Sequence, residues 1–151
     1  MNKYAIEDVV PHAHPMILIE QLKEFCEDSA TCLLEIKELS NFYNPQKKSI
    51  PSYVGLEYLA QSIAAYANAN KVAEGGEVAL GFLVSARSFK AAVSEFRLGM
   101  QLETRVTKLF KEENGLSVFD CSIVCGEDKL VEAKINVYEP ENPDLYLKEN
   151  T

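Results

Sequence analysis

Four side chains in this sequence have the types and spacing that proton-transfer chemistry needs. Glu57 and Gln61 stand four residues apart in an Ala- and Leu-rich segment, and His12 and His14 are the two histidines of the chain. Carboxyl and imidazole groups exchange protons near neutral pH when their surroundings tune them. Residues four apart on a helix are one turn apart, so Gln61 can hydrogen-bond Glu57.

Glu57 is a candidate acid because of where it stands in the sequence. It falls on the second turn of a segment that we predict to be a buried helix. Burial disfavours the charged form of a carboxyl and raises its pKa toward values useful for proton transfer. The alternative is an ordinary acid near a helix N-terminus, stabilised by the helix dipole and turned toward solvent. Periodicity leaves both interpretations open.

The two histidines lie in the proline-flanked stretch Pro11–Pro15. Such a pair can begin a metal site, but further ligands are not visible nearby, and ordinary loop histidines are the simpler interpretation. No Cys-x-x-Cys pair occurs among the cysteines, which we interpret as free thiols; they are Cys26, Cys32, Cys121 and Cys125. We therefore expect neither a metal nor a cofactor.

Alternation of apolar and polar residues predicts that much of the chain forms β-strands. Turn signals separate these strands, and the Asn114-Gly115 pair is the clearest of them. The segment Val78–Phe89 is apolar on both faces, so we expect it at the centre of the sheet. The six predicted strands are Met16–Phe25, Ala30–Leu39, Val78–Phe89, Leu102–Phe110, Leu116–Cys125 and Val131–Val137.

The segment Ser52–Val72 departs from this pattern and predicts one long helix. Pro51 stands at its start and Gly75-Gly76 provide its stop. At a rise of about 1.5 Å per residue the helix would be roughly 30 Å long. Its predicted apolar face consists of Leu56, Leu59, Ala60, Ile63, Ala64 and Ala67. One long helix among six strands predicts an α+β fold, with a bent antiparallel sheet of about six strands wrapped around the helix.

Length, charge and hydropathy narrow the class of protein. The 151 residues fit one domain, which we predict over residues 1–140, with a loose C-terminal tail over 141–151. The net charge of −8 argues against nucleic acid as a main ligand. No signal-like start and no long apolar run is present, which predicts a cytoplasmic protein without a membrane span.

Two stretches resemble a known enzyme family. IPSYVGLEYLAQ, residues 50–61, resembles the central-helix signature of bacterial 3-hydroxyacyl-ACP dehydratases, in which a Pro-Gly pair starts a helix that carries a catalytic acid and then Ala-Gln. VPHAHPMILIE, residues 10–20, resembles their N-terminal Pro-His segment. Together with Gly81–Leu83, Gly115–Cys121 and Asn136–Tyr138, these stretches make residues 10–140 similar to the divergent aryl-polyene-type, or ApeP-like, subfamily.

The resemblance implies a hot-dog fold, dimerisation through the sheet and an acyl tunnel at the dimer interface. It also implies that 3-hydroxyacyl thioesters on acyl carrier protein are dehydrated to 2-enoyl thioesters, in fatty-acid-like or polyene biosynthesis. This reaction needs a base at C2, an acid at the C3 hydroxyl and donors for the thioester carbonyl. By resemblance Glu57 is the acid, while Ser52, Tyr53, Gln61 and Tyr43 contact the substrate, the first two through amides at the helix start.

The family pattern is broken at one position. The housekeeping dehydratases carry their base histidine fourteen positions before the helix acid, where this chain has Tyr43. Tyrosine, with a pKa of about 10, is a poor base at neutral pH. Three interpretations follow: His12 or His14 has become the base; a heterodimer partner supplies a histidine; or the chain is a thioesterase or a non-catalytic acyl-thioester-binding protein.

Docking of an acidic carrier protein would need a local basic surface on this acidic chain. Lys47 and Lys48 directly precede the predicted helix, and we predict that they form this docking site. Ordinary solvated lysines are the alternative.

Overall fold

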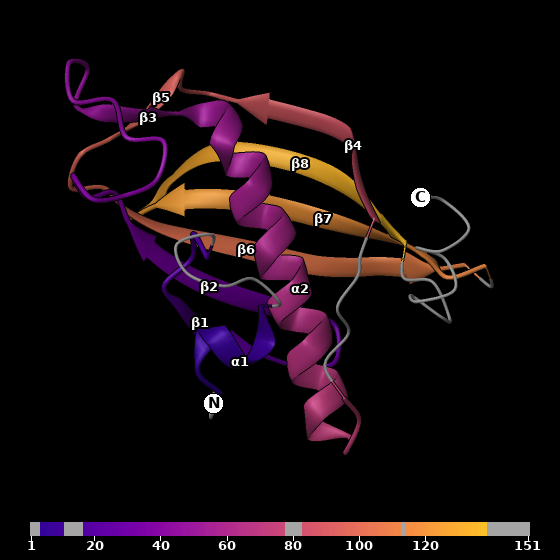
Figure 1. Ribbon diagram of the computed structural model, residues 1–151. Coiled ribbons are helices and arrows are strands. Elements are labelled where there is room, and N and C mark those ends of the chain that lie inside the picture. The colour runs from indigo at the N-terminus through magenta and orange to yellow at the C-terminus, as the bar shows by residue number, and fades with distance from the viewer. Residues whose placement is uncertain (1–3, 11–16, 78–82, 113, 139–151) are drawn as a thin grey trace, which may run out of the picture.

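The computed structural model describes residues 4–10, 17–77, 83–112 and 114–138 (Figure 1). Two helices, one 3-10 turn and eight strands occur in this part of the chain. In chain order they are α1 (Ile6–Val9), β1 (Gln21–Phe25), β2 (Ser29–Glu35), β3 (Ser49–Pro51), η1 (Ser52–Val54), α2 (Gly55–Ala73), β4 (Leu83–Ala91), β5 (Glu95–Arg97), β6 (Gln101–Lys111), β7 (Leu116–Cys125) and β8 (Asp128–Tyr138).

The fold is a curved antiparallel sheet with one long helix against it. Six strands pair in the order β1-β2-β6-β7-β8-β4, and α2 lies across one face of this sheet (Figure 1). A second sheet of two strands, β3 and β5, lies at the start of α2. The predicted α+β architecture, one helix enclosed by a six-stranded antiparallel sheet, is therefore confirmed.

The six predicted strands correspond to the six strands of the large sheet, and β7 has the predicted bounds Leu116–Cys125, whereas β3 and β5 were not predicted. Strand β2 ends at Glu35, earlier than predicted, and β1 begins only at Gln21. The main error concerns β4, which lies at an edge of the sheet and not at its centre. Its apolar residues were the basis of that prediction, and Val84 is in fact 38% exposed because β8 is the only strand beside β4 among the described residues.

Helix α2 ends where the sequence predicts. Gly75 has a φ of +86°, a left-handed conformation that glycine adopts without strain. Its N–H donates to the carbonyl of Val72 at 3.0 Å, and the N–H of Gly76 donates to the carbonyl of Lys71 at 2.7 Å. These bonds satisfy carbonyls at the end of the helix and turn the chain away from the helix axis.

The face of α2 that packs on the sheet differs from the predicted one. Tyr66 packs edge-on against Phe119 of β7, with ring centroids 5.5 Å apart, and Ala65 and Ala69 are fully buried. Leu59, Ile63 and Ala64 are buried as predicted, but Leu56, Ala60 and Ala67 are only half-buried. The prediction missed the packing face because tyrosine and serine were not counted as apolar positions, although small and aromatic residues let a helix approach a sheet closely.

The described part of the chain contains no helix that is long and apolar enough to cross a membrane. The tail over 141–151 lies outside the described residues, and the division into a domain over 1–140 and a tail stays a prediction.

Candidate active site

The start of α2 is held in place by the small sheet of β3 and β5. Register pairs run from Ser49 with Arg97 to Pro51 with Glu95. The hydroxyl of Ser49 donates to Oε2 of Glu95 at 2.7 Å. The backbone N–H of Ser52 donates to the carbonyl of Ser94 at 3.0 Å. The first residues of the helical segment are thus tied to a part of the chain about forty residues further on.

Gly55 lets the first turn of α2 approach β5 and β7 closely. A Cβ built at this position would lie 2.8 Å from Cδ1 of Ile123 and 3.3 Å from the Phe96 ring. Ile123 and Phe96 are both fully buried, so neither side chain has empty space into which it can move. Packing therefore favours glycine at position 55 of the Gly-Leu-Glu sequence. The missing side chain lets the turn that carries Glu57 lie close to Ile123 and Phe96.

Glu57 lies in the first turn of α2 and its side chain is exposed. The prediction of a buried Glu57 is therefore wrong for the single chain. The physical reason is the orientation of the helix, which turns the next residue, Tyr58, into the core and leaves position 57 on a flank. An acid in the first helical turn is stabilised by the helix dipole.

Gln61 connects Glu57 to the N-terminal part of the chain. Its Nε2 donates to Oε1 of Glu57 at 3.3 Å, which confirms the predicted contact between residues one turn apart. Its Oε1 accepts the backbone N–H of Leu18 at 2.8 Å. The side chain of Gln61 is 1% exposed, so these bonds are made away from bulk water.

A second buried amide on the same flank of α2 holds the other end of the N-terminal segment. Nδ2 of Asn68, which is fully buried, donates to the carbonyl of Val9 at 2.9 Å. Seven residues separate Asn68 from Gln61, about two helical turns or roughly 10 Å. The chain is thus anchored to one flank of α2 just before residue 11 and just after residue 16. His12 and His14 lie between these anchors, outside the described residues.

The predicted substrate contacts are distributed unevenly around the helix start. The amide of Ser52 is already bonded to Ser94, so it does not serve as a donor for a thioester carbonyl. Of the two predicted amide donors, Tyr53 is left, and Val54 carries the next amide along η1. The Tyr53 side chain is 73% exposed. Tyr43 is half-buried against the core, and its N–H donates to the carbonyl of Ser40 at 3.2 Å.

A concavity of about 350 Å³ opens beside this part of α2. Tyr58, the neighbour of Glu57, and Leu18, the partner of Gln61, both line it. Burial raises the pKa of Tyr58 to about 12, so its hydroxyl keeps its proton at neutral pH. The remaining walls come from the N-terminal segment and from β2 and the loop after it; they are Ile17, Glu20, Leu34, Glu35, Lys37, Leu39, Ser40 and Asn41.

Lys47 and Lys48 are exposed in the loop that leads into β3. The side-chain oxygen of Asn44 accepts the N–H of Lys47 at 3.2 Å, and the carbonyl of Asn44 accepts the N–H of Lys48 at 2.8 Å. Both lysines are therefore exposed in the loop before β3 and the helix start, and their docking role stays a prediction.

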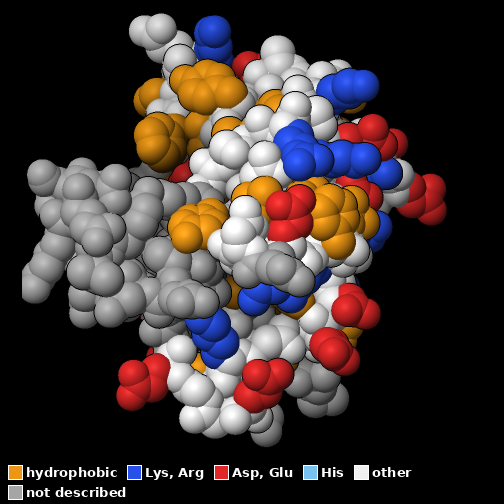
Figure 2. Space-filling view, turned by 90° about the vertical axis from the view of Figure 1, so that its right-hand side faces the viewer, with side chains coloured by type: hydrophobic (Ala, Val, Ile, Leu, Met, Phe, Trp, Pro, Cys, Tyr) orange, Lys and Arg blue, Asp and Glu red, His pale blue; other side chains and the backbone are white. Residues whose placement is uncertain are grey.

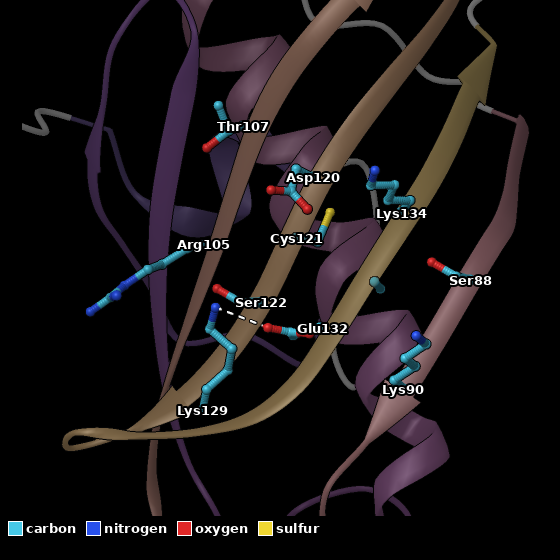
Figure 3. A pocket seen from close by; sticks show the side chains of 11 residues that line it. Ser88, Lys90, Arg105, Thr107, Asp120, Cys121, Ser122, Lys129, Glu132 and Lys134 are labelled. Atoms are coloured by element: carbon cyan, nitrogen blue, oxygen red, sulfur yellow. Dashed lines mark ion pairs between the residues drawn. The ribbon is translucent and has the colours of Figure 1, made fainter.

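Another concavity, of about 380 Å³, lies on the opposite face of the sheet. Figure 3 shows α2 behind the strands, while Arg105, Asp120 and Lys134 lie on the near side. Lys129 pairs with Glu132 at 3.1 Å within it. Acidic and basic side chains also intermingle on the face shown in Figure 2. The concavity lies on the side of the sheet opposite α2 and mixes charges of both signs, which is typical of a solvated face.

No group of three or more potential metal-ligating side chains occurs among the residues that the structure describes. Sequence reasoning missed Leu18, which bonds to Gln61 of α2, and Ser94, which bonds to Ser52 of η1. Both act through the backbone, so their side-chain types gave no signal. The buried role of Asn68 was missed as well, although an asparagine inside an apolar helix could have suggested it.

Comparison with solved structures defines the class of protein. The fold is similar to that of a chain in the structure named "The Dehydratase Heterocomplex ApeI:P from Xenorhabdus doucetiae", with a TM-score of 0.89 and 22% sequence identity. The superposition covers 99% of this chain and 100% of that chain. A hypothetical thioesterase with coenzyme A from Streptococcus pneumoniae has a TM-score of 0.56 at 11% identity, with 78% of this chain and 83% of that chain covered. The fold is thus that of the hot-dog proteins, which is the predicted fold.

Sequence comparison narrows the class to a family. The chain is 33% identical over 61 residues to 3-hydroxyacyl-[acyl-carrier-protein] dehydratase FabZ of Streptococcus thermophilus strain LMD-9. That match spans 38% of this chain and only 43% of the length of FabZ. The sequence model of the ApeP-like family, described as ApeP dehydratase, matches residues 4–148. The chain therefore belongs to the ApeP-like dehydratase family, as the resemblance of its motifs implied.

Proposed function

We propose that this protein takes part in the dehydration of 3-hydroxyacyl thioesters to 2-enoyl thioesters, as a hydro-lyase. The observation that carries the proposal is the position of Glu57, held by Gln61 in the first turn of α2 in a chain that the dehydratase family matches over residues 4–148. The name of FabZ, which specifies an acyl-carrier-protein substrate, supports a carrier-bound thioester.

The proposed reaction assigns one proton to each of two groups. A base removes the C2 proton, the C2–C3 double bond forms, and the C3 hydroxyl leaves as water after accepting a proton from Glu57. Negative charge that develops on the thioester carbonyl is stabilised by backbone donors at the start of α2, namely the amides of Tyr53 and Val54. The half-buried Tyr43 and the exposed Tyr53 ring contact the acyl or pantetheine part of the substrate.

The base can come from this chain. Leu18 is bonded to Gln61, one turn from Glu57. His12 and His14 precede Leu18 by six and four residues in the sequence, so both stand in the segment that leads to the flank of α2 carrying Glu57. We propose His12 as the base of an enzyme that acts alone, with His14 as the second choice.

The base can instead come from a second hot-dog subunit, and we favour a two-subunit site. Two observations support it: Glu57 is exposed in the single chain, and β4 leaves one side of its backbone open among the described residues. A partner that extends the sheet at β4 would cover exposed apolar side chains such as Val84. The similar structure from Xenorhabdus doucetiae is named as a dehydratase heterocomplex, which supports a related partner here.

Carrier-protein docking is proposed at Lys47 and Lys48. Carrier domains are acidic, and two exposed ammonium groups beside the start of α2 would guide the thioester arm toward Glu57. The chain itself has a net charge of −8, so such a local basic site is needed to offset long-range repulsion.

The decisive experiment supplies 3-hydroxyacyl-ACP to the purified protein, alone and with a second hot-dog protein that carries the family histidine. Enoyl product is expected, and it should disappear with Glu57→Gln. Activity that the protein shows alone and loses with His12→Ala supports a base from this chain. Activity that requires the second protein supports the two-subunit site. Release of free acid and thiol without enoyl product would contradict dehydration and favour the thioesterase alternative; binding without turnover would favour a non-catalytic protein.

A further inference from the structure

The side-chain amide of Gln61 has a fixed orientation. A backbone N–H can only donate a hydrogen bond, so the Gln61 atom that faces Leu18 at 2.8 Å has to be the oxygen, Oε1. The nitrogen then points the other way, toward the carboxylate of Glu57 at 3.3 Å. A carboxylate accepts from N–H donors, so both contacts have matching polarity. The hydrogen bond from Leu18 thereby determines that the nitrogen of the Gln61 amide, and not its oxygen, faces Glu57.

Burial makes this orientation costly to change. Gln61 is 1% exposed, and a buried amide that lost its partners would carry the desolvation penalty without compensation. Turning the amide over would place its NH₂ group against the N–H of Leu18 and its oxygen against the carboxylate. Both of these arrangements are repulsive, so the packing and polarity around Gln61 keep its nitrogen toward Glu57.

Glu57 gains order from this bond. An exposed glutamate exchanges among several rotamers and loses conformational entropy when it is fixed. A hydrogen bond from a rigid, buried donor one turn along the helix favours the rotamer in which Oε1 reaches Nε2. A reacting group that is held in place before substrate binds lowers the barrier, and misplacement by 1 Å can cost about 100-fold in rate.

We propose that Gln61 is a positioning residue for Glu57, locked in orientation by the backbone of Leu18, and that it is not a substrate-binding residue. The inference rests on the proposed function in so far as Glu57 takes part in catalysis. It replaces the substrate contact that sequence resemblance implied for Gln61. It also makes the N-terminal segment part of the machinery that orients the acid on α2.

The first test measures side-chain order without any substrate. Three-bond Hα–Hβ couplings of Glu57 in the intact labelled protein should indicate one χ1 rotamer in the wild type and rotamer averaging in Gln61→Met, which keeps the buried volume but makes neither hydrogen bond. The matched control is Asn70→Leu, which removes an amide from a half-buried residue of the same helix that donates to the carbonyls of Cys26 and Tyr66. Unchanged couplings in Gln61→Met would overturn the proposal.

Glu57→Ala provides a second measurement in case Gln61→Met folds poorly. Position 57 is exposed, so the fold should tolerate alanine. The side-chain NH₂ protons of Gln61 should then exchange faster with solvent than in the wild type, because the carboxylate that accepts a hydrogen bond from them is removed. Exchange at the wild-type rate would show that the bond to Glu57 does not restrain Gln61.

Kinetics of the active assembly then separate positioning from substrate binding. Gln61→Met should lower kcat by roughly 10- to 100-fold while KM changes by less than about twofold. A raised KM with unchanged kcat would instead restore Gln61 as a substrate contact. If the wild type dehydrates nothing with any partner, the proposed function fails, yet the coupling and exchange data still decide whether Gln61 positions Glu57.

Discussion

Ser62 of α2 and Thr104 of β6 share a hydrogen bond of 2.6 Å in a part of the core that excludes water. The Ser62 hydroxyl also donates to the carbonyl of Tyr58 at 2.8 Å. A hydroxyl has one proton, and the other acceptor near Thr104, the carbonyl of Cys32, is 3.5 Å away, so the shorter contacts assign Thr104 as the donor between the two side chains. This hydrogen bond between the middle of α2 and β6 is therefore directional, with Ser62 accepting from Thr104 and donating to Tyr58.

This direction predicts unequal effects of removing the two hydroxyls. Ser62→Ala removes the nearest partner of the Thr104 hydroxyl, leaves the carbonyl of Cys32 at 3.5 Å, and should lower the free energy of unfolding by about 1–3 kcal/mol. Thr104→Val leaves Ser62 bonded to Tyr58 and should cost about 1 kcal/mol or less. Urea unfolding of both single variants and the double variant measures these changes. Additive effects would contradict a direct bond.

The tight contact at Gly55 predicts a rescue. Gly55→Ala places a methyl group 2.8 Å from Cδ1 of Ile123, and overpacking of this kind costs about 1–3 kcal/mol. Ile123→Val removes that Cδ1 atom and should itself cost about 0.5–1.5 kcal/mol. Combined with Ile123→Val, the Gly55→Ala change should therefore be less destabilising than in the wild type. Thermal unfolding of the four proteins checks this, and an equal cost in both backgrounds would place the strain elsewhere.

The exposure of Glu57 predicts that activity and stability separate at this position. Glu57→Gln should reduce dehydration by about 100-fold or more, the usual loss when a proton-transfer group is removed. Its unfolding free energy should change by less than about 0.5 kcal/mol, as for most surface changes. Glu74→Gln, an exposed acid at the opposite end of α2, is the matched control and should keep full activity. Comparable losses in both variants would rule out a specific role for Glu57.

Two cysteines should differ strongly in reactivity. Hydrogen bonds from Ser29, followed by the backbone at Asp28, lower the pKa of the exposed Cys26 thiol, whereas burial raises the pKa of Cys32 to about 11. Because the thiolate is the reactive form, a lowered pKa means faster alkylation near neutral pH. Iodoacetamide with mass spectrometry should label Cys26 first in the folded protein and Cys32 only after unfolding. Ser29→Ala should shift the pH midpoint of Cys26 labelling upward; an unchanged midpoint would refute the role of Ser29.

Charge reversal at the proposed docking site should weaken carrier-protein binding. Lys47→Glu with Lys48→Glu is expected to reduce affinity for acyl carrier protein, with a difference from the wild type that shrinks as salt is added. Lys111→Glu, an exposed lysine at the end of β6, is the control with a single charge reversal. Calorimetric titration at low and high salt measures the effect. Unchanged affinity at low salt would remove Lys47 and Lys48 from the docking surface.

Elements set by local patterns were predictable from the sequence. The alternation in Leu116–Cys125 identified β7 with its bounds, and Gly75-Gly76 identified the end of α2, because both signals depend on a few neighbouring residues. The bond between Gln61 and Glu57 was predictable for the same reason, since four residues separate the two on one helix.

Features set by tertiary packing were not predictable. The bond from Leu18 to Gln61 joins residues 43 apart and uses a backbone group, which has no side-chain signature. The exposure of Glu57 depends on how far α2 is rotated about its axis, and that rotation follows from contacts such as Tyr66 with Phe119. The edge position of β4 was not predictable, because apolar residues on both faces of a strand do not show how many strands of the same chain pair with it.

The open side of β4 has a consequence for handling the protein. The other edge strand, β1, has five residues and exposes Lys23 and Glu24, features that discourage pairing with other chains. Strand β4 has nine residues and exposes the apolar Val84 and Ala86 beside the charged Arg87 and Lys90. A long edge of this kind is a template for unwanted strand addition during overexpression, concentration and storage. Co-production with the proposed partner subunit should therefore limit aggregation, independently of any effect on catalysis.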